Sequence, residues 1–412
     1  MRSLGILILL LLFVSCKQAE PTLVSLEKDV AILSADEFEG RETGKEGEQK
    51  AANYIAERFK NLKLQPKGTN GFLQEFSFKN SSSPHEKPKF SEEKSDSLTL
   101  GKSVIAYLDN QAETTIVIGA HFDHLGYGIQ GSLFPGVDTI HNGADDNASG
   151  VAMMLKLAYE LQNKKQQKVT NNNYLFIAFS GEEMGLLGSN YFVKNPTIDL
   201  KKVNYMINMD MVGRLNEEKA VSISGVGSSP SFSQTLHAVN DFGLKIIENQ
   251  SGVGPSDHTS FYLSDIPVLH FFTGQHEDYH KPSDDAHLIN YVGMETLSNY
   301  ILAVVEDLDS FGKLAFRATK NESEETPRFK VGLGIVPDYL FDGEGMRIDG
   351  VSEGKPAQKA GLQKGDIVKK LDTTSITDMM SYMKALSAFE AGQKTKVIID
   401  RKGEFIELEV AF

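Results

Sequence analysis

The stretch TTIVIGAHFD, residues 114–123, is an almost unbroken apolar run that ends in histidine and aspartate. An apolar run of this length, rich in β-branched residues, is typical of a strand buried on both faces. Three more segments share this character: NYLFIAFSGEE (173–183), VNYMINMDM (203–211) and IPVLHFF (266–272). Between them, GVAMMLKLAYELQ (150–162) has apolar residues at helical spacing. Strands that alternate with helices predict an α/β fold with helices on both faces of one sheet.

The chain has 412 residues, which suits two or three domains better than one. Its 40% hydrophobic and 24% charged residues are values of a globular protein with a sizeable core. The formal net charge of −14 argues against non-specific binding to nucleic acid or to anionic membranes.

The N-terminus has the pattern of an export signal. Arg2 precedes an apolar run, Leu4–Val14, that is too short to span a bilayer. The segment FVSC ends in Cys16, the only cysteine, and resembles the cleavage site of bacterial lipoproteins, with Phe13 where leucine is more usual. We therefore predict a lipoprotein signal over residues 1–16, a lipid anchor at Cys16 and a periplasmic or cell-envelope location. The alternative is an ordinary secretory signal with an incidental cysteine.

Changes in composition divide the rest of the chain. A polar tether over residues 17–24 is followed by the α/β domain, predicted over residues 25–312. Residues 313–328 are charged and weakly periodic, which favours a linker. Residues 329–412 contain short apolar runs and one helical pattern, and they predict a separate β-rich domain.

Acidic and histidine residues gather where the predicted strands end. They are His121, Asp123 and His124 in AHFDH, Asp145 and Asp146 in GADDNASG, Glu182 and Glu183 in SGEE, Asp210 in NMDM, and Tyr279, His280 and Asp284 in DYHKPSDD. Ligands of open α/β sheets bind beyond the carboxyl ends of the strands. So many carboxylates in one place require positive charge, and these motifs contain no arginine and only one lysine, Lys281. Histidine and carboxylate side chains without a thiolate suit divalent zinc, although manganese or cobalt would also fit.

These five motifs, in this order, resemble those of the co-catalytic di-zinc aminopeptidase family, which also contains glutamate carboxypeptidases and glutaminyl cyclases. The opening FEGRETG (38–44) and AANYIAERF (51–59) resemble the N-terminal segment of the same family. The resemblance covers roughly residues 25–310. It implies a zinc exopeptidase fold with a mixed, largely parallel central sheet, and two divalent metal ions, most simply Zn²⁺.

The resemblance also implies roles for particular residues. One metal ion would be bound by His121, Asp146 and Asp210. Asp123 would orient His121. Asp146 would bridge to a second ion, while its neighbours Asp145 and Asn147 would shape the turn and cap the following helix.

The second ion would be bound by Asp146, Glu183 and His280. Glu182 would be the general base, taking a proton from the attacking water and passing it to the leaving amine. Tyr279 would stabilise the oxyanion. Asp257, in a motif that resembles a substrate-side loop of the family, would support the site. Four further histidines are predicted to be no ligands: His124, His141, His258 and His287.

The C-terminal domain resembles a PDZ domain. GLGI, formed by Gly332, Leu333, Gly334 and Ile335, resembles the carboxylate-binding loop, and AGLQKGDIV (360–368) resembles another PDZ signature. The resemblance implies a groove that binds a protein or peptide C-terminus next to a helix around residues 378–388. The alternative is a domain that only packs on its neighbour.

The sequence therefore favours an exported metallopeptidase that removes N-terminal residues from peptides. Two alternatives stay open at this point: a carboxypeptidase or dipeptidase on the same scaffold, and a non-catalytic lipoprotein adaptor that works through its PDZ-like domain.

Overall fold

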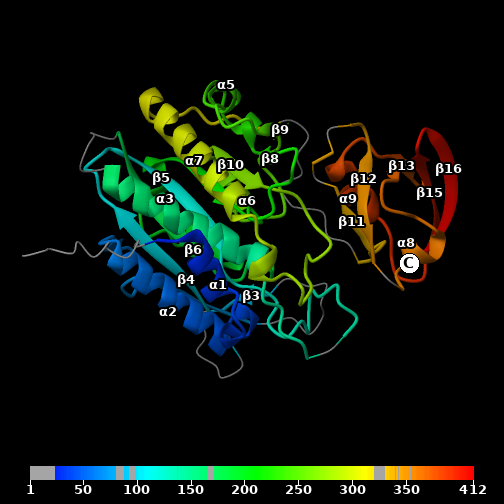
Figure 1. The fold of residues 1–412 in the computed structure, drawn as a ribbon, viewed down its shortest axis with the longest axis horizontal. Helices are drawn as coiled ribbons and strands as arrows, with labels where there is room; N and C mark the ends of the chain where they lie inside the picture. The colour runs from blue at the N-terminus through cyan, green and yellow to red at the C-terminus, as the bar shows by residue number, and fades with distance from the viewer. Residues whose placement is uncertain are drawn as a thin grey trace, which may run out of the picture.

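A computed structural model describes residues 24–79, 88–91, 98–136, 138–164, 171–319, 330–338, 340–341, 343–352 and 354–412. The predicted signal, Cys16 and nearly all of the tether lie outside these residues, so export and lipid anchoring stay predictions. The described chain forms two separate sheets (Figure 1). Each has its own apolar core. In the described part, no helix combines the length and the apolar character that crossing a bilayer needs.

The helices of the first domain are α1 (Leu26–Leu33), α2 (Glu46–Asn61), α3 (Gly150–Lys164), α4 (Leu187–Lys194), α5 (Phe232–Ala238), α6 (His258–Tyr262) and α7 (Tyr291–Leu308). Its strands are β1 (Gln65–Pro66), β2 (Leu73–Lys79), β3 (Lys89–Phe90), β4 (Thr99–Leu108), β5 (Thr114–His121), β6 (Asn172–Phe179), β7 (Val203–Met209), β8 (Ala220–Ser224), β9 (Lys245–Asn249) and β10 (Val268–Phe272).

The strands form one mixed sheet in the order β3-β2-β4-β6-β5-β7-β10-β8-β9, with β1 beside β4. The four segments predicted as buried strands are β6, β5, β7 and β10. They are neighbours in the centre of the sheet and pair in parallel. The flanks add antiparallel pairs, such as β4 with β6 and β10 with β8. The predicted mixed sheet is thus confirmed. Its parallel pairs are those of the four central strands and the pair β8–β9.

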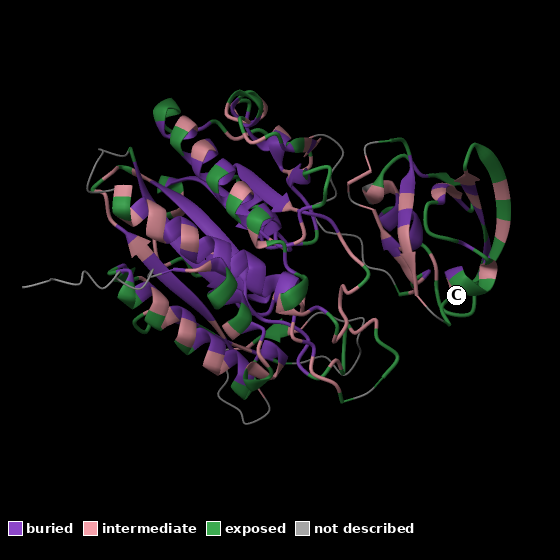
Figure 2. Ribbon diagram, in the orientation of Figure 1, coloured by how far each residue is buried: buried purple, intermediate pink, exposed green. Residues whose placement is uncertain are grey.

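Helices cover both faces of this sheet, as predicted. Ile116, Ile118 and Ala120 of β5 point into a cluster that includes residues of α1, α2, α3 and α7. Val117 of the same strand points to the other face, where α4 and α6 supply Phe192 and other apolar residues. The central strands are buried on both sides (Figure 2). Their nearly continuous hydrophobicity follows from this position, because alternate residues face different helix layers.

The C-terminal domain is a separate antiparallel sheet with its own core. Its elements are β11 (Ile335–Pro337), β12 (Met346–Val351), α8 (Pro356–Ala360), β13 (Ile367–Leu371), β14 (Thr374–Ser375), α9 (Met379–Leu386), β15 (Lys394–Arg401) and β16 (Glu404–Ala411). The strand order is β11-β12-β13-β15-β16, so β11 lies at an edge. α9 begins with a capping box at Asp378 and Ser381. It is the helix that the sequence predicted around residues 378–388.

The first part of the predicted linker packs on the first domain. Leu314 is buried, Phe316 lies against Tyr262 with ring centroids 5.4 Å apart, and the Thr319 N–H donates to the Tyr262 hydroxyl oxygen at 2.9 Å. This segment was predicted to be a linker because it is charged, but its apolar residues Leu314 and Phe316 pack on the first domain. Residues 320–328 lie outside the described chain.

Glu48 is a buried carboxylate of α2 that ties this helix to the sheet. It accepts hydrogen bonds from Gly44 N at 2.7 Å and Lys102 N at 3.0 Å, and another from the Ser180 hydroxyl. Burial raises the pKa of Glu48 to about 7, although these three hydrogen bonds oppose the shift.

We expect the free energy of unfolding of a Glu48→Gln variant to fall less between pH 5 and pH 8 than that of the wild type. An unfolded glutamate loses its proton near pH 4.5, whereas folded Glu48 keeps its proton up to about pH 7. This group therefore lowers the free energy of unfolding by about 3 kcal/mol as pH rises through that window. Glutamine imitates the protonated acid and abolishes this loss. Urea unfolding at pH 5 and pH 8 measures it.

The matched control is Glu57→Gln, because Glu57 is an exposed glutamate on the same helix. Its unfolding free energy should keep the wild-type dependence on pH. If Glu48→Gln had the same pH dependence as the wild type, the raised pKa of Glu48 would be wrong.

Candidate active site

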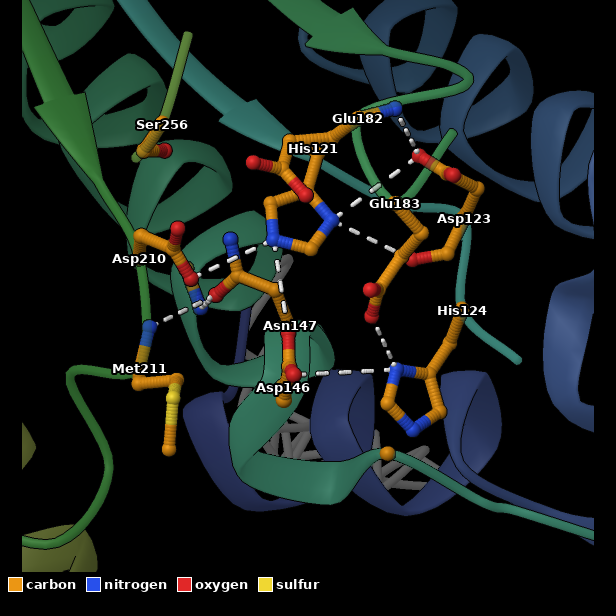
Figure 3. A network of polar contacts seen from close by, with 12 residues as sticks. His121, Asp123, His124, Asp146, Asn147, Glu182, Glu183, Asp210, Met211 and Ser256 are labelled. Carbon is orange, nitrogen blue, oxygen red and sulfur yellow. Dashed lines mark hydrogen bonds and ion pairs between the residues drawn. The ribbon is translucent and has the colours of Figure 1, made fainter. Parts of the chain in front are cut away.

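The polar residues predicted from the strand ends converge at one edge of the sheet. His121 is the last residue of β5, Glu182 and Glu183 follow β6, and Asp210 follows β7. Asp146 lies in the turn before α3 (Figure 3). The parallel centre of the sheet explains this, because its strands all deliver their carboxyl ends to the same edge.

A first group of ligand atoms forms around His121. Its Nε2 lies 3.2 Å from Asp210 Oδ1 and 3.4 Å from Asp146 Oδ1. One ligand atom from each of these three residues lies within 4.8 Å of the others, which is the spacing of a shared metal ion.

A second group forms on the other oxygen of Asp146. His280 Nε2 lies 3.2 Å from Asp146 Oδ2 and 3.3 Å from Glu183 Oε2. His124 Nδ1 lies 2.9 Å from Glu183 Oε1 and 3.8 Å from Asp146 Oδ2. The Asp146 carboxylate thus stands between the two groups (Figure 3).

His124, which was predicted not to be a ligand, lies inside the cluster. His124, Asp146 and Glu183 offer ligand atoms within 4.8 Å of one another. The ring is buried, and its Nε2 has no hydrogen-bond partner in the described chain. The AHFDH motif contained the signal, but His124 follows the end of β5, where strand alternation no longer predicts its direction.

The metal-facing nitrogens of two histidines are set by bonds on the opposite side of each ring. His280 Nδ1 lies 2.9 Å from the Gly131 carbonyl oxygen, which can only accept, so Nδ1 carries the proton. His121 Nδ1 lies 3.2 Å from the Asp123 carbonyl oxygen. In both rings, Nε2 therefore faces the carboxylates, on the side where a metal ion would bind.

Asp123 contacts the His121 ring through its backbone carbonyl oxygen, which is closer to the ring than its carboxylate is. Its Oδ1 is 3.8 Å from His121 Nδ1 but accepts a hydrogen bond from Glu182 N at 3.1 Å. Its Oδ2 accepts from the Thr43 hydroxyl at 3.0 Å. Burial raises the pKa of Asp123 to about 6. Asp123 thus joins the end of β5 to the loop that carries Glu182 and Glu183.

The turn at Asp146 is held by its neighbours as the sequence predicted. Asp145 Oδ1 accepts from Gly213 N at 2.6 Å, and Asp145 Oδ2 lies 3.1 Å from His276 Nε2. Asn147 Oδ1 accepts from Gly150 N at 3.0 Å, which caps α3. A side chain at Gly143 would place Cβ 2.1 Å from the Asp146 carbonyl oxygen, so only glycine fits there.

Asp284 and Arg41 support the site, although the sequence analysis gave neither a role. Asp284 is fully buried and accepts hydrogen bonds from Asp145 N and Asp146 N at 3.0 Å. The guanidinium of Arg41 is almost fully buried and donates to the carbonyl oxygens of Phe122 at 2.7 Å and Gly143 at 2.9 Å. Burial lowers the pKa of Arg41 to about 10, although several carboxylates of the cluster oppose the shift. Arg41 thereby clamps the segments that carry His121 and Asp146.

The two adjacent glutamates differ in their electrostatics. Burial, with the charges of Asp210 and Glu183, raises the pKa of Glu182 well above its usual value. Burial acts on Glu183 in the same direction, but the charges and hydrogen bonds of His280 and His124 outweigh it and hold its pKa well below the usual value. Glu183 is therefore the charged member of the pair, whereas Glu182 is a carboxylate with high proton affinity.

Asp257, predicted to support the site, is fully buried, and neither of its oxygens has a hydrogen-bond partner within 3.5 Å in the described chain. Burial raises its pKa to about 7. His258 stacks on His270 with ring centroids 4.4 Å apart, outside both ligand groups. His141 bonds to the Thr139 carbonyl oxygen at 2.8 Å, also outside them.

A cleft of about 610 Å³ opens over the cluster. His121, Asp146, Glu182, Asp210 and His280 lie in its lining. Tyr279 also lines the cleft, and its ring stacks on that of His280 with centroids 3.8 Å apart. The cleft is of the size that binds a small ligand or part of a peptide.

The donor set fits a pair of divalent metal ions. It consists of imidazole nitrogens and carboxylate oxygens only, with one carboxylate shared by both groups. The described motifs gather more carboxylates than histidines, and a cation between them would offset their repulsion. Zinc accepts these ligand types.

Both domains match known protein families. Residues 103–305 match Peptidase family M28, and residues 312–412 match the PDZ domain family. A probable leucine aminopeptidase of Arthroderma benhamiae is 32% identical over 173 residues, which are 40% of this chain and 44% of that protein. Aminopeptidase YwaD of Bacillus subtilis is 30% identical over 173 residues, 40% of this chain and 37% of that protein. The chain thus spans less than half the length of these curated relatives.

Solved structures share the fold of the first domain. The zinc aminopeptidase BSAP of Bacillus subtilis has a TM-score of 0.51 at 17% identity, covering 72% of this chain and 96% of that chain. The Legionella pneumophila aminopeptidase LapA has a TM-score of 0.52 at 20% identity, covering 69% and 70%. A glutaminyl cyclase of Porphyromonas gingivalis has a TM-score of 0.53 at 18% identity, covering 69% and 97%.

The first match includes His121, Asp146, Glu183 and Asp210, and the second match covers the separate antiparallel sheet. Residues 103–305 therefore belong to Peptidase family M28, and residues 312–412 form a C-terminal PDZ domain.

Proposed function

We propose that the first domain is a metal-dependent aminopeptidase that hydrolyses N-terminal residues from peptides. The observation that carries the proposal is the Asp146 carboxylate, whose two oxygens face two separate groups of ligands, one at His121 and one at His280. Relatives named as aminopeptidases, among them that of Bacillus subtilis, support the direction of cleavage.

Two metal ions held by these groups, most simply zinc, would lower the pKa of a water molecule between them and polarise the scissile carbonyl. The chain's own residues would do the rest. Glu182 lines the cleft but belongs to neither ligand group, so its carboxylate is free to accept the proton of the attacking water. The high proton affinity of Glu182 suits a group that holds this proton before passing it to the leaving amine.

Tyr279 is the residue we propose for contact with the substrate carbonyl. It lines the cleft, and stacking on His280 fixes its ring beside the second ligand group. A phenol placed there can donate a hydrogen bond to the oxygen that becomes negatively charged in the transition state.

The test combines metal analysis of the chain from Lys17 onward with a panel of substrates. We expect two divalent ions per chain and hydrolysis of leucyl amides with a free α-amine. The N-acetylated forms of the same substrates should not be cleaved, and a chelator should abolish the activity until zinc is added back.

Cleavage from the carboxyl end would move the protein to the carboxypeptidase alternative. Cyclisation of N-terminal glutamine without hydrolysis would favour the reaction named for the Porphyromonas gingivalis relative. A chain that binds no metal and shows no turnover would refute the proposal and favour the adaptor alternative.

A further inference from the structure

The PDZ domain helps to form the cleft over the candidate ligand residues. The lining that contains His121 and His280 also contains residues of the PDZ domain. These are Asp338, Phe341 and Met346 in and near β11 and β12, and Met379 and Met383 of α9. The two domains also touch beside the cleft, because a Cβ built on Gly274 would lie 2.8 Å from Leu340 Cδ1. The peptidase site and the PDZ domain therefore share one continuous cavity.

The direction of β11 connects the GLGI loop to this cavity. β11 begins at Ile335, the last residue of GLGI, and ends at Pro337, one residue before the cleft-lining Asp338. β11 pairs with β12 on one side only and is an edge strand. A peptide added antiparallel to its free edge would have its C-terminus at the loop and its N-terminal end toward the cleft.

The GLGI loop has the properties of a carboxylate site. No described residue accepts a hydrogen bond from the backbone N–H of Leu333 or of Gly334. A Cβ on Gly334 would lie 2.2 Å from the Cβ of Lys355, so the side chain of Lys355 packs directly over the loop. Lys355 is exposed, and its ammonium has no ion pair in the described part of the chain. Two free donors and a nearby cation are complementary to a terminal carboxylate.

α9 supplies the other wall. Met379, Met383 and Leu386 are spaced i, i+4 and i+7 and so lie on one face of the helix. The first two line the cavity, and flexible methionine side chains adapt to peptides of varied sequence. Lys384, also on α9, is the only lysine or arginine among the cleft-lining residues of the described chain.

We propose that the PDZ domain binds the free C-terminus of a peptide substrate and directs the N-terminus of that same peptide into the peptidase site. This inference rests on the aminopeptidase function proposed above. It makes the enzyme selective for linear peptides that have both a free α-amine and a free α-carboxylate, and whose length matches the distance between the two sites.

The experiment compares pairs of peptides with leucine at the N-terminus, from dipeptides to about ten residues, in the free-acid and C-amidated forms. Leucyl aminomethylcoumarin, which cannot reach the PDZ loop, reports the peptidase site alone. We expect free acids to exceed amides in kcat/KM by about tenfold or more, starting at the length that spans both sites.

The variant is Lys355→Glu, and the readout is the ratio of kcat/KM for acid and amide, so that each enzyme is its own reference. We expect this ratio to fall to about 1. The matched control is Lys402→Glu, because Lys402 is exposed on the β15–β16 turn outside the cleft and should keep the wild-type ratio.

Equal rates for acids and amides at all lengths, with active hydrolysis of the coumarin substrate, would overturn this inference and leave the aminopeptidase intact. Loss of the preference in Lys384→Glu but not in Lys355→Glu would also overturn it, because the carboxylate would then bind at α9. No hydrolysis of the coumarin substrate would instead refute the aminopeptidase proposal itself.

Discussion

A Glu182→Gln variant is expected to hydrolyse leucyl substrates about 10³-fold more slowly than the wild type while it keeps its metal ions. Glutamine has nearly the same shape but cannot accept the proton of the attacking water. Glu182 is a member of neither ligand group, so its replacement leaves the metal-binding atoms in place. Steady-state kinetics and metal analysis on the same preparation measure both effects.

The fall should appear in kcat rather than in KM, since Glu182 acts on the proton and not on the bound substrate. Glu217→Gln is the matched control, because Glu217 is exposed and lies outside the cleft. It should keep the wild-type rate. Undiminished turnover by Glu182→Gln would exclude Glu182 as the general base and direct attention to other carboxylates of the cleft.

An Asp146→Asn variant is expected to lose most of its bound metal and, with it, activity by at least about 10³-fold. Among the residues that the structure describes, Asp146 alone has one oxygen facing each ligand group, at 3.4 Å from His121 Nε2 and 3.2 Å from His280 Nε2. An asparagine amide offers one neutral oxygen and a nitrogen that cannot bind a cation. Metal content should therefore fall from two ions to below one per chain.

Thermal unfolding gives a second readout of the same loss. A metal ion that binds only the folded chain raises the unfolding temperature, so a chelator should lower it in the wild type. The chelator should have no effect on Asp146→Asn. Asp241→Asn, at an exposed position, is the control that should behave as the wild type. Two tightly bound metal ions in Asp146→Asn would contradict the bridging role.

Metal content should also distinguish the roles of the two histidines that face Glu183, His124 and His280. We expect His280→Gln to retain about one metal ion and His124→Gln to retain both. The reason is that His280 Nε2 lies close to both carboxylates, 3.2 Å from Asp146 and 3.3 Å from Glu183, whereas His124 Nδ1 lies 2.9 Å from Glu183 but 3.8 Å from Asp146. The reverse result would make His124 the ligand and His280 its neighbour.

The central sheet and most of the cluster could be predicted from the sequence. β5, β6, β7 and β10 are buried on both faces, and such strands are apolar along their whole length. This pattern marks each strand and the point at which it ends. Parallel strands end at one edge, so the polar residues that follow β5, β6 and β7 had to lie close together.

His124, Arg41 and Asp284 could not be assigned in this way. His124 comes after the strand end, where the direction of a side chain depends on the loop. Arg41 acts on carbonyl oxygens near residues 122 and 143, which are far away in sequence. Asp284 acts on the backbone of the Asp146 turn, also distant in sequence. These contacts arise only when loops cross, and no local periodicity records them.

The sequence by itself thus determined the strands, the helix α3, the edge of the sheet that carries the site and the separate C-terminal domain. Each of these follows from the burial of neighbouring residues, which leaves a regular pattern in the chain. Only the tertiary structure decided which histidines face Glu183, which buried groups hold the Asp146 turn, and that the PDZ domain lines the peptidase cleft. Those features depend on how distant segments and whole domains pack, and packing between distant surfaces leaves no period in a sequence.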